Sequence, residues 1–177
     1  MQRFSFYDGN KKTRFMGVIN ITEDSFYDKS RCLTVEAAMT LAEKMVNDGA
    51  DFLDIGAESS RPGSKPISEQ EELGKLIPAV EYLSKRVDIP ISVDTYKPKI
   101  AEEALIAGAK IINDITGMQT YTEMPKVVSR YQAGIIAMHM KGTPMNMQDN
   151  PHYENVVEEI KIFLRDSIKI SEKAEIG

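Results

Sequence analysis

Polar side chains able to bind ligands recur along this chain, each set placed directly after a short apolar run. Carboxylates accept paired hydrogen bonds, and amide oxygens can serve as ligands for hard cations. Any one of these residues could instead cap a helix or close a loop, but five sets in succession favour a shared site. The sets are Asn20, Asp54 with Glu58, Asp94 with Thr95, Asn113 with Asp114, and His139.

The apolar runs themselves have the length and flanking residues of buried parallel strands. They are Phe15–Ile19, Phe52–Ile55, Ile91–Val93, Ile111–Ile112 and Ile135–Met138. Before the first of them, Phe4–Tyr7 and the residues around Thr13 flank Asp8-Gly9-Asn10, which predicts a hairpin turn.

Helical patterns fill the intervals between the runs. Apolar residues recur at helical spacing, and the ends carry capping signals such as Ser68-Glu69-Gln70-Glu71, a capping box, and Pro98 before Gly108. The predicted helices are Thr34–Asp48 with Gly49 after it, Ser68 towards Arg86, Pro98 to Gly108, a weaker one over Glu123–Tyr131, and a long one over Tyr153–Lys173.

Strand followed by helix, five times, predicts a parallel sheet with helical crossovers. The sheet could be open and doubly wound or closed as a barrel. No G-x-G-x-x-G follows the first strand, which removes the main sign of a dinucleotide-binding sheet. In a βα barrel the carboxyl ends of the strands face one site, which suits the recurring polar sets.

Bulk properties narrow the class of protein. The 177 residues are 42% hydrophobic, which is enough for one sizeable core, and their net charge is −5. The sequence has no block of Lys and Arg long enough to bind nucleic acid, which disfavours that class of protein. Cys32 is the single cysteine, which favours a reducing compartment and an inert thiol. The N-terminus lacks a signal-peptide pattern, and no apolar run approaches the ~18 residues of a membrane helix, so we expect a cytoplasmic protein.

Several motifs together resemble dihydropteroate synthase. They are MGVINITEDSF at 16–26, DIGAESSRPG at 54–63, SVDT at 92–95, INDI at 112–115, and MHMKGTP at 138–144 with Met147-Gln148. The resemblance covers essentially the whole chain. Glu23 stands where the family usually has Pro, which should loosen the first loop, and Ser60 stands where Thr is common.

The resemblance implies an α/β TIM barrel of the pterin-binding type, incomplete in this chain. We expect one domain over 1–177 that stops before the sixth strand. The family's sixth-strand D-P-G-[IF]-G-F, seventh-strand lysine and eighth-strand R-x-H have no counterpart here. We therefore expect the 177-residue chain to be inactive alone.

The implied activity is that of a transferase in folate biosynthesis, which condenses hydroxymethyl-dihydropterin pyrophosphate with para-aminobenzoate and releases pyrophosphate. Its cofactor would be Mg²⁺, with Asn20 as the protein ligand, although an Asn in this position could simply start a turn. We expect a homodimer when the barrel is complete, and no nucleic-acid or membrane partner.

The remaining site residues follow the same resemblance. Asp94 and Asn113 would hold the pterin and support catalysis, with helix capping as the alternative for Asp94. Met138 would form an apolar wall of the ring pocket or simply fill the core. Arg61 would bind the pyrophosphate or the substrate carboxylate, unless it is a solvated loop arginine. The aromatic amine would contact Ser60, Pro62 and Phe26.

Some assignments stay open. Structural pairing is the favoured role for Asp54, the role of Glu58 is undecided, and His139 is expected to be a hydrogen-bonded strand-end residue rather than a base. Loops 21–33 and 57–67 are long for βα connections, and we expect them to close over bound pyrophosphate. A pterin-binding methyltransferase and a non-catalytic pterin-binding module are the alternative functions.

Overall fold

The computed structural model describes residues 13–21, 34–58, 67–143, 145–147 and 149–176. The turn expected at Asp8-Gly9-Asn10 lies outside these residues, as does Cys32. The same holds for most of the two loops expected to close over a ligand.

Five parallel strands form one sheet in sequence order, which confirms the predicted topology. Each strand begins within one residue of its apolar run, and several continue into the polar residues that follow. The strands are β1 (Met16–Asn20), β2 (Phe52–Gly56), β3 (Ile91–Asp94), β4 (Ile111–Asp114) and β5 (Gly134–Ala137).

A helix follows each strand, and the capping signals mark most of the helix ends. The Thr34 and Ser68 hydroxyls accept hydrogen bonds from the Ala37 and Glu71 amides at 3.1 and 3.2 Å. Gly108 ends its helix with φ +116°, which only glycine adopts easily. The helices are α1 (Val35–Asn47), α2 (Glu69–Leu83), α3 (Pro98–Ala107), α4 (Met124–Arg130) and α5 (Val156–Lys173).

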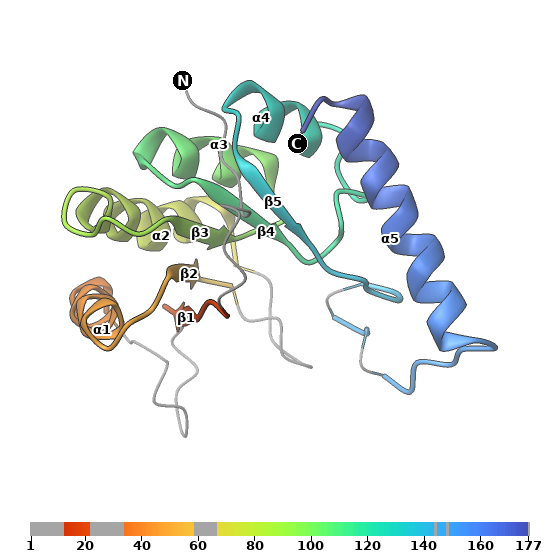
Figure 1. The fold of residues 1–177 in the computed structure, drawn as a ribbon, viewed down its shortest axis with the longest axis horizontal. Helices are drawn as coiled ribbons and strands as arrows, with labels where there is room; N and C mark the ends of the chain where they lie inside the picture. The colour runs from red at the N-terminus through yellow and green to blue at the C-terminus, as the bar shows by residue number, and fades with distance from the viewer. Residues whose placement is uncertain (1–12, 22–33, 59–66, 144, 148, 177) are drawn as a thin grey trace.

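Successive helices α1, α2, α3 and α4 pack against one another along one side of the sheet (Figure 1). In a doubly wound fold, helices would cover both faces, so this arrangement is that of a barrel wall. The strands do not close into a full barrel, because β1 and β5 each pair with only one described strand.

The two faces of the sheet differ in chemistry because side chains alternate along each strand. The face towards the helices is apolar and buried, and it includes Ile19, Ile55, Val93 and Ile112, all 0% exposed. The opposite face carries polar side chains near the carboxyl ends of the strands. The helices thus cover the apolar face of the sheet, and the polar side chains on the opposite face can form a site.

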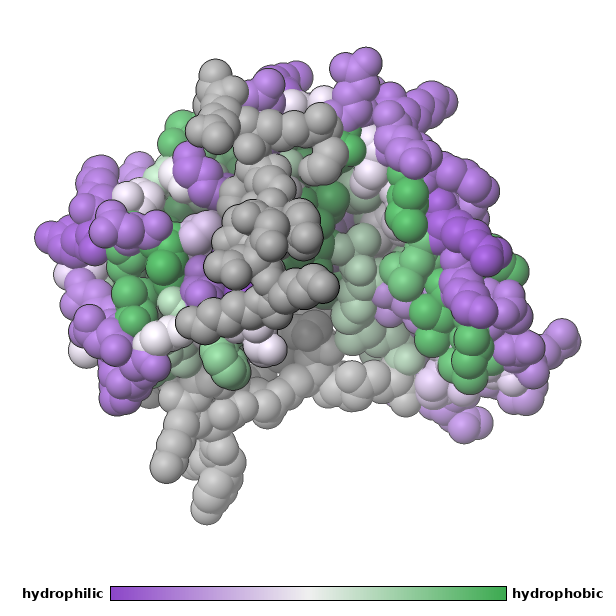
Figure 2. Space-filling view, viewed as in Figure 1, coloured by the Kyte–Doolittle hydropathy of each residue, from purple (hydrophilic) through white to green (hydrophobic). Residues whose placement is uncertain are grey.

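Apolar side chains also remain exposed at both ends of the described sheet. Val18 on β1 is 44% exposed, and on α5 the exposed residues are Val156, Val157, Ile162 and Ile168. Figure 2 shows apolar surface running along α5 between polar side chains. Among the described residues, no helix is long and apolar enough to cross a membrane.

Candidate active site

A row of residues in register crosses four strands at their carboxyl ends. Asn20 pairs with Gly56, Gly56 with Asp94, and Asp94 with Asn113. Because the strands are parallel and paired without offset at this level, their side chains lie on the same face of the sheet. The structure therefore brings together three of the predicted site residues, one carboxylate between two carboxamides.

Gly56 leaves the space in which Asn20 and Asp94 approach each other. A Cβ atom at position 56 would lie 3.2 Å from Asn20 Oδ1 and 3.5 Å from Asp94 Oδ2. A side chain at this position would crowd both groups. The glycine within the DIGAESSRPG motif thus has a steric reason to lie in the middle of the row.

Asp94 is partly buried among other carboxylates. Burial raises the pKa of Asp94 to about 7, and the nearby charges of Asp54, Glu72, Asp114 and Glu58 act in the same direction. Near neutral pH this carboxyl therefore exists in both protonation states. A ligand that donates hydrogen bonds to it would favour the ionised form and lower its pKa again.

Asp54 supports the row from one layer below. Its side chain is 4% exposed, and its Oδ2 accepts a hydrogen bond from Asn113 Nδ2 at 3.0 Å. Burial raises the pKa of Asp54, against the lowering effect of the neighbouring Ser92 and Asn113 side chains. Asp54 thus holds the Asn113 amide in one orientation, the pairing role favoured from the sequence. Its Oδ1 and Ser92 Oγ, adjacent in register, have no hydrogen-bond partner among the described residues.

Asp114 and His139 lie outside this row. Asp114 is on the helix-facing side of β4 and accepts hydrogen bonds from the Thr116 and Met118 amides at 2.8 and 3.0 Å. It therefore shapes a turn. His139 packs against the rings of Tyr153 and Phe163, with centroid distances of 5.9 and 5.0 Å, so its described surroundings are aromatic.

Met138 follows directly after β5 and is 36% exposed. Both roles expected for Met138, a wall of the ring pocket and ordinary core filling, stay predictions. The other predicted ligand-binding residues, Phe26, Ser60, Arg61 and Pro62, lie outside the described residues, and so does Glu23.

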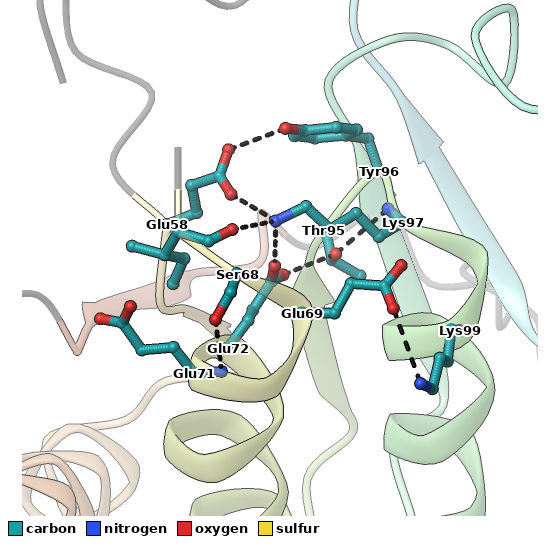
Figure 3. A network of polar contacts seen from close by, with 10 residues as sticks. Glu58, Ser68, Glu69, Glu71, Glu72, Thr95, Tyr96, Lys97 and Lys99 are labelled. Carbon is teal, nitrogen blue, oxygen red and sulfur yellow. Dashed lines mark hydrogen bonds and ion pairs between the residues drawn. The ribbon is translucent and has the colours of Figure 1, made fainter. Parts of the chain in front are cut away.

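A buried ionic cluster beside the row was not predicted from the sequence (Figure 3). Lys97 lies between Glu58 and Glu72, with N–O distances of 2.5 and 2.7 Å. One signal for it was present: Glu72 occupies the same stripe of α2 as the buried Leu76 and Leu83. A carboxylate on an apolar stripe needs a buried cationic partner.

The donor chemistry of the row suits Mg²⁺ held mainly by phosphate and water. No group of three or more His, Cys, Asp or Glu side chains among the described residues forms a ready metal cage. Mg²⁺ is typically bound through one or two protein oxygens together with substrate phosphates. The Asn20 carboxamide would supply one such oxygen, next to Gly56 in the row.

Comparison with known proteins matches residues 16–177 to the family described as pterin binding enzyme. The dihydropteroate synthase of Clostridium beijerinckii is 37% identical over 94% of this chain and 59% of its own length. A dihydropteroate synthase from Yersinia pestis, solved with a sulfonamide drug, superposes with a TM-score of 0.86 at 38% identity, covering 93% of this chain and 59% of that one.

The Xanthomonas albilineans dihydropteroate synthase, solved with 4-aminobenzoic acid, gives a TM-score of 0.83 at 39% identity over 94% of this chain and 59% of that one. The chain thus spans about three fifths of the length of such relatives. The shared fold, the matched residues and the row at the strand ends agree: the chain belongs to the family of pterin-binding enzymes.

Proposed function

We propose that the protein is a dihydropteroate synthase, in which this chain supplies the pterin half of the active site. The observation that carries the proposal is the row of Asn20, Asp94 and Asn113 around Gly56. The names of the relatives support it. The proposed reaction joins hydroxymethyl-dihydropterin pyrophosphate to para-aminobenzoate.

Asp94 and Asn113 bind the pterin in this proposal. The amidine edge of a pterin offers two N–H donors, which match the two oxygens of an ionised Asp94. Asn113 contributes its carbonyl oxygen and its second Nδ2–H, because one Nδ2–H already donates to Asp54. The Asp94 charge also stabilises the positive charge that develops at the pterin methylene as the leaving group departs.

In this proposal, Asn20 and Arg61 stabilise the pyrophosphate leaving group. The methylene C–O bond to pyrophosphate breaks, the amine nitrogen forms the new C–N bond, and one amine proton is lost to solvent. Asn20 would hold Mg²⁺, which when bound would neutralise charge on the pyrophosphate. Arg61 adds a second cationic contact to pyrophosphate or to the carboxylate of the aromatic amine.

Ser60, Pro62 and Phe26 complete the proposal as contacts of para-aminobenzoate, with Met138 at the pterin ring. The chain forms a single domain, 1–177, of an enzyme that is a homodimer in the cytoplasm. A pterin-binding methyltransferase would use the same Asp94 and Asn113. The relatives described above are synthases, which favours the first reading.

The test is pyrophosphate release by the complete enzyme with both substrates and Mg²⁺. Replacing Asp94 with Ala removes one preorganised electrostatic contact and should lower kcat by about 10²–10³. An exposed carboxylate, Asp88, provides the control, and Asp88→Ala should leave the rate unchanged. Methyl transfer from a methylated pterin, without any synthase reaction, would instead support the alternative.

A further inference from the structure

The Lys97 ammonium is fully engaged by three acceptors. It donates to Glu58 Oε2 at 2.5 Å, to Glu72 Oε2 at 2.7 Å and to the Ile67 carbonyl oxygen at 3.0 Å (Figure 3). An ammonium group has three N–H donors, so none is left over for a ligand. Any influence of Lys97 on a reaction must therefore act through the groups that it holds.

Those groups come from separate parts of the chain. Glu58 and Ile67 are the described residues on either side of the segment 59–66, and Glu72 lies in the first turns of α2. Lys97 itself follows Asp94 by three residues and precedes α3. One cation thus ties two distant points of the β2–α2 connection to the end of the strand that carries Asp94.

Further hydrogen bonds fix the carboxylates in place. The Tyr96 hydroxyl donates to Glu58 Oε1 at 2.8 Å, and the Thr95 hydroxyl donates to Glu72 Oε1 at 2.7 Å. The side chains of Lys97, Glu58 and Glu72 are 11%, 12% and 1% exposed, so solvent screens the cluster weakly. Burial alone would lower the pKa of Lys97, but its bonds to Glu58 and Glu72 outweigh this effect and raise it.

We propose that Lys97 is a positioning residue that fixes Glu58 and Ile67 relative to Asp94. It would thereby align the binding of the aromatic amine with that of the pterin. This role rests on the proposed function, in which the β2–α2 connection contributes to the amine site. Lys97 touches neither substrate, and its effect is on geometry.

The obvious variant, Lys97→Met, leaves two buried carboxylates without a cation and can fail to fold. The double variant Lys97→Met with Glu72→Gln removes the cation together with the more deeply buried of its two anions, and Glu58, which is 12% exposed, keeps the hydrogen bond from the Tyr96 hydroxyl. An amide at position 72 can still accept the Thr95 hydrogen bond. The matched control is Lys99→Met with Glu69→Gln, which removes a surface pair at 3.6 Å whose side chains are 64% and 51% exposed.

Kinetics of the complete synthase separate positioning from stability. The double variant should keep a urea midpoint close to that of the unmodified enzyme. Its KM for para-aminobenzoate should nevertheless rise about 10-fold or more, because small displacements of binding groups from a preorganised geometry weaken substrate binding strongly. The KM for the pterin pyrophosphate should stay within about twofold, and the control should change neither. If both KM values and the urea midpoint of the double variant match those of the unmodified enzyme, Lys97 has no positioning role and the proposal is wrong.

A second measurement does not depend on activity. Backbone ¹⁵N order parameters of Glu58 and Ile67 in the 177-residue chain should fall from the rigid range near ~0.85 towards ~0.6 in the double variant and stay unchanged in the control. Unchanged values overturn the positioning role. A fall in these values, together with no pyrophosphate release by the unmodified complete enzyme, supports the positioning role and rejects the proposed function.

Discussion

The surroundings of Asp94 disfavour the ionised form of its carboxyl group. Its pKa is about 7 in the folded chain because of burial and neighbouring carboxylates, whereas the unfolded chain has the ordinary value near 3.8. Between these values the folded state binds more protons than the unfolded state. The contribution of Asp94 therefore lowers the free energy of unfolding as pH rises from about 4 to about 7.

This sign predicts that Asp94→Asn stabilises the chain at high pH. At pH 8 the amide removes an unfavourable buried charge, and the free energy of unfolding should rise by roughly 2–4 kcal/mol. At pH 4 the folded carboxyl is neutral like the amide and the unfolded carboxyl is only partly ionised, so the difference should become small. Urea unfolding at the two pH values checks this, with Asp88→Asn as an exposed control. A stabilisation independent of pH would contradict the electrostatic cause.

Asn20 provides a second prediction at the residue scale. In the complete enzyme, Asn20→Ala should weaken Mg²⁺-dependent pyrophosphate binding by about 10-fold or more and leave para-aminobenzoate binding nearly unchanged. Calorimetric titration with each ligand, with and without Mg²⁺, measures the difference. Equal losses for both ligands, or an unchanged metal requirement, would rule out Asn20 as the metal ligand.

The sequence predicted the residues of the row, but it did not predict the buried ion pairs beside them. Asn20, Asp94 and Asn113 each end an apolar run, so alternation along the strands places them together. The Glu58–Lys97 contact joins residues 39 positions apart, and no periodicity of either segment encodes that pairing. Buried ion pairs depend on the angle at which loops leave the strands, which one sequence does not show.

At the scale of elements, the capping residues predicted most helix ends correctly. Where a predicted end was wrong, a local hydrogen bond explains the difference. Helix α5 begins at Val156 instead of Tyr153, because the Asn155 side chain accepts from the Glu158 amide and so starts the helix there. The Tyr153 ring instead lies under the Lys141 ammonium at 4.3 Å. Helix α2 stops at Leu83, short of Arg86, where the Arg86 amide bonds back to Leu83 across a tighter turn.

Two glycines in or after helices should respond to alanine with opposite signs. Gly74 is exposed inside α2 with open space around its Cβ position, so Gly74→Ala should raise the free energy of unfolding by about 1 kcal/mol. Gly108 has φ +116°, and a Cβ there would lie 2.6 Å from the Cβ of Ser84. Gly108→Ala should lower the free energy of unfolding by about 2–4 kcal/mol. Urea titration of both variants decides the matter, and equal signs would refute the assigned geometry.

At the scale of the whole molecule, the sheet order β1 to β5 and the one-sided packing of α1 to α4 distinguish a barrel wall from an open doubly wound sheet. Composition alone left that choice open. The difference arises from how neighbouring helices pack, as α2 does against both α1 and α3. Exposed apolar residues on β1 and α5 mark where the wall is uncovered in the described structure.

The chain of 177 residues should be inactive as a synthase when it is alone. Under the proposed function it provides Asn20, Asp94 and Asn113, with Arg61 from the DIGAESSRPG motif, whereas the sixth-strand Asp, seventh-strand Lys and eighth-strand Arg and His that the resemblance implies are not among these 177 residues. Each missing preorganised contact typically lowers the rate by ~10²–10³.

The assay is pyrophosphate release with both substrates and Mg²⁺, on protein whose mass is confirmed to end at Gly177. A complete dihydropteroate synthase measured in parallel shows that the reagents are competent. Pterin binding by the short chain, followed by fluorescence, should be weak and should depend on Asp94, since Asp94 and Asn113 supply its described polar pterin contacts in the proposed function. Turnover on the order of 1 s⁻¹ would mean that these residues suffice, or that a second copy of the chain rebuilds the site.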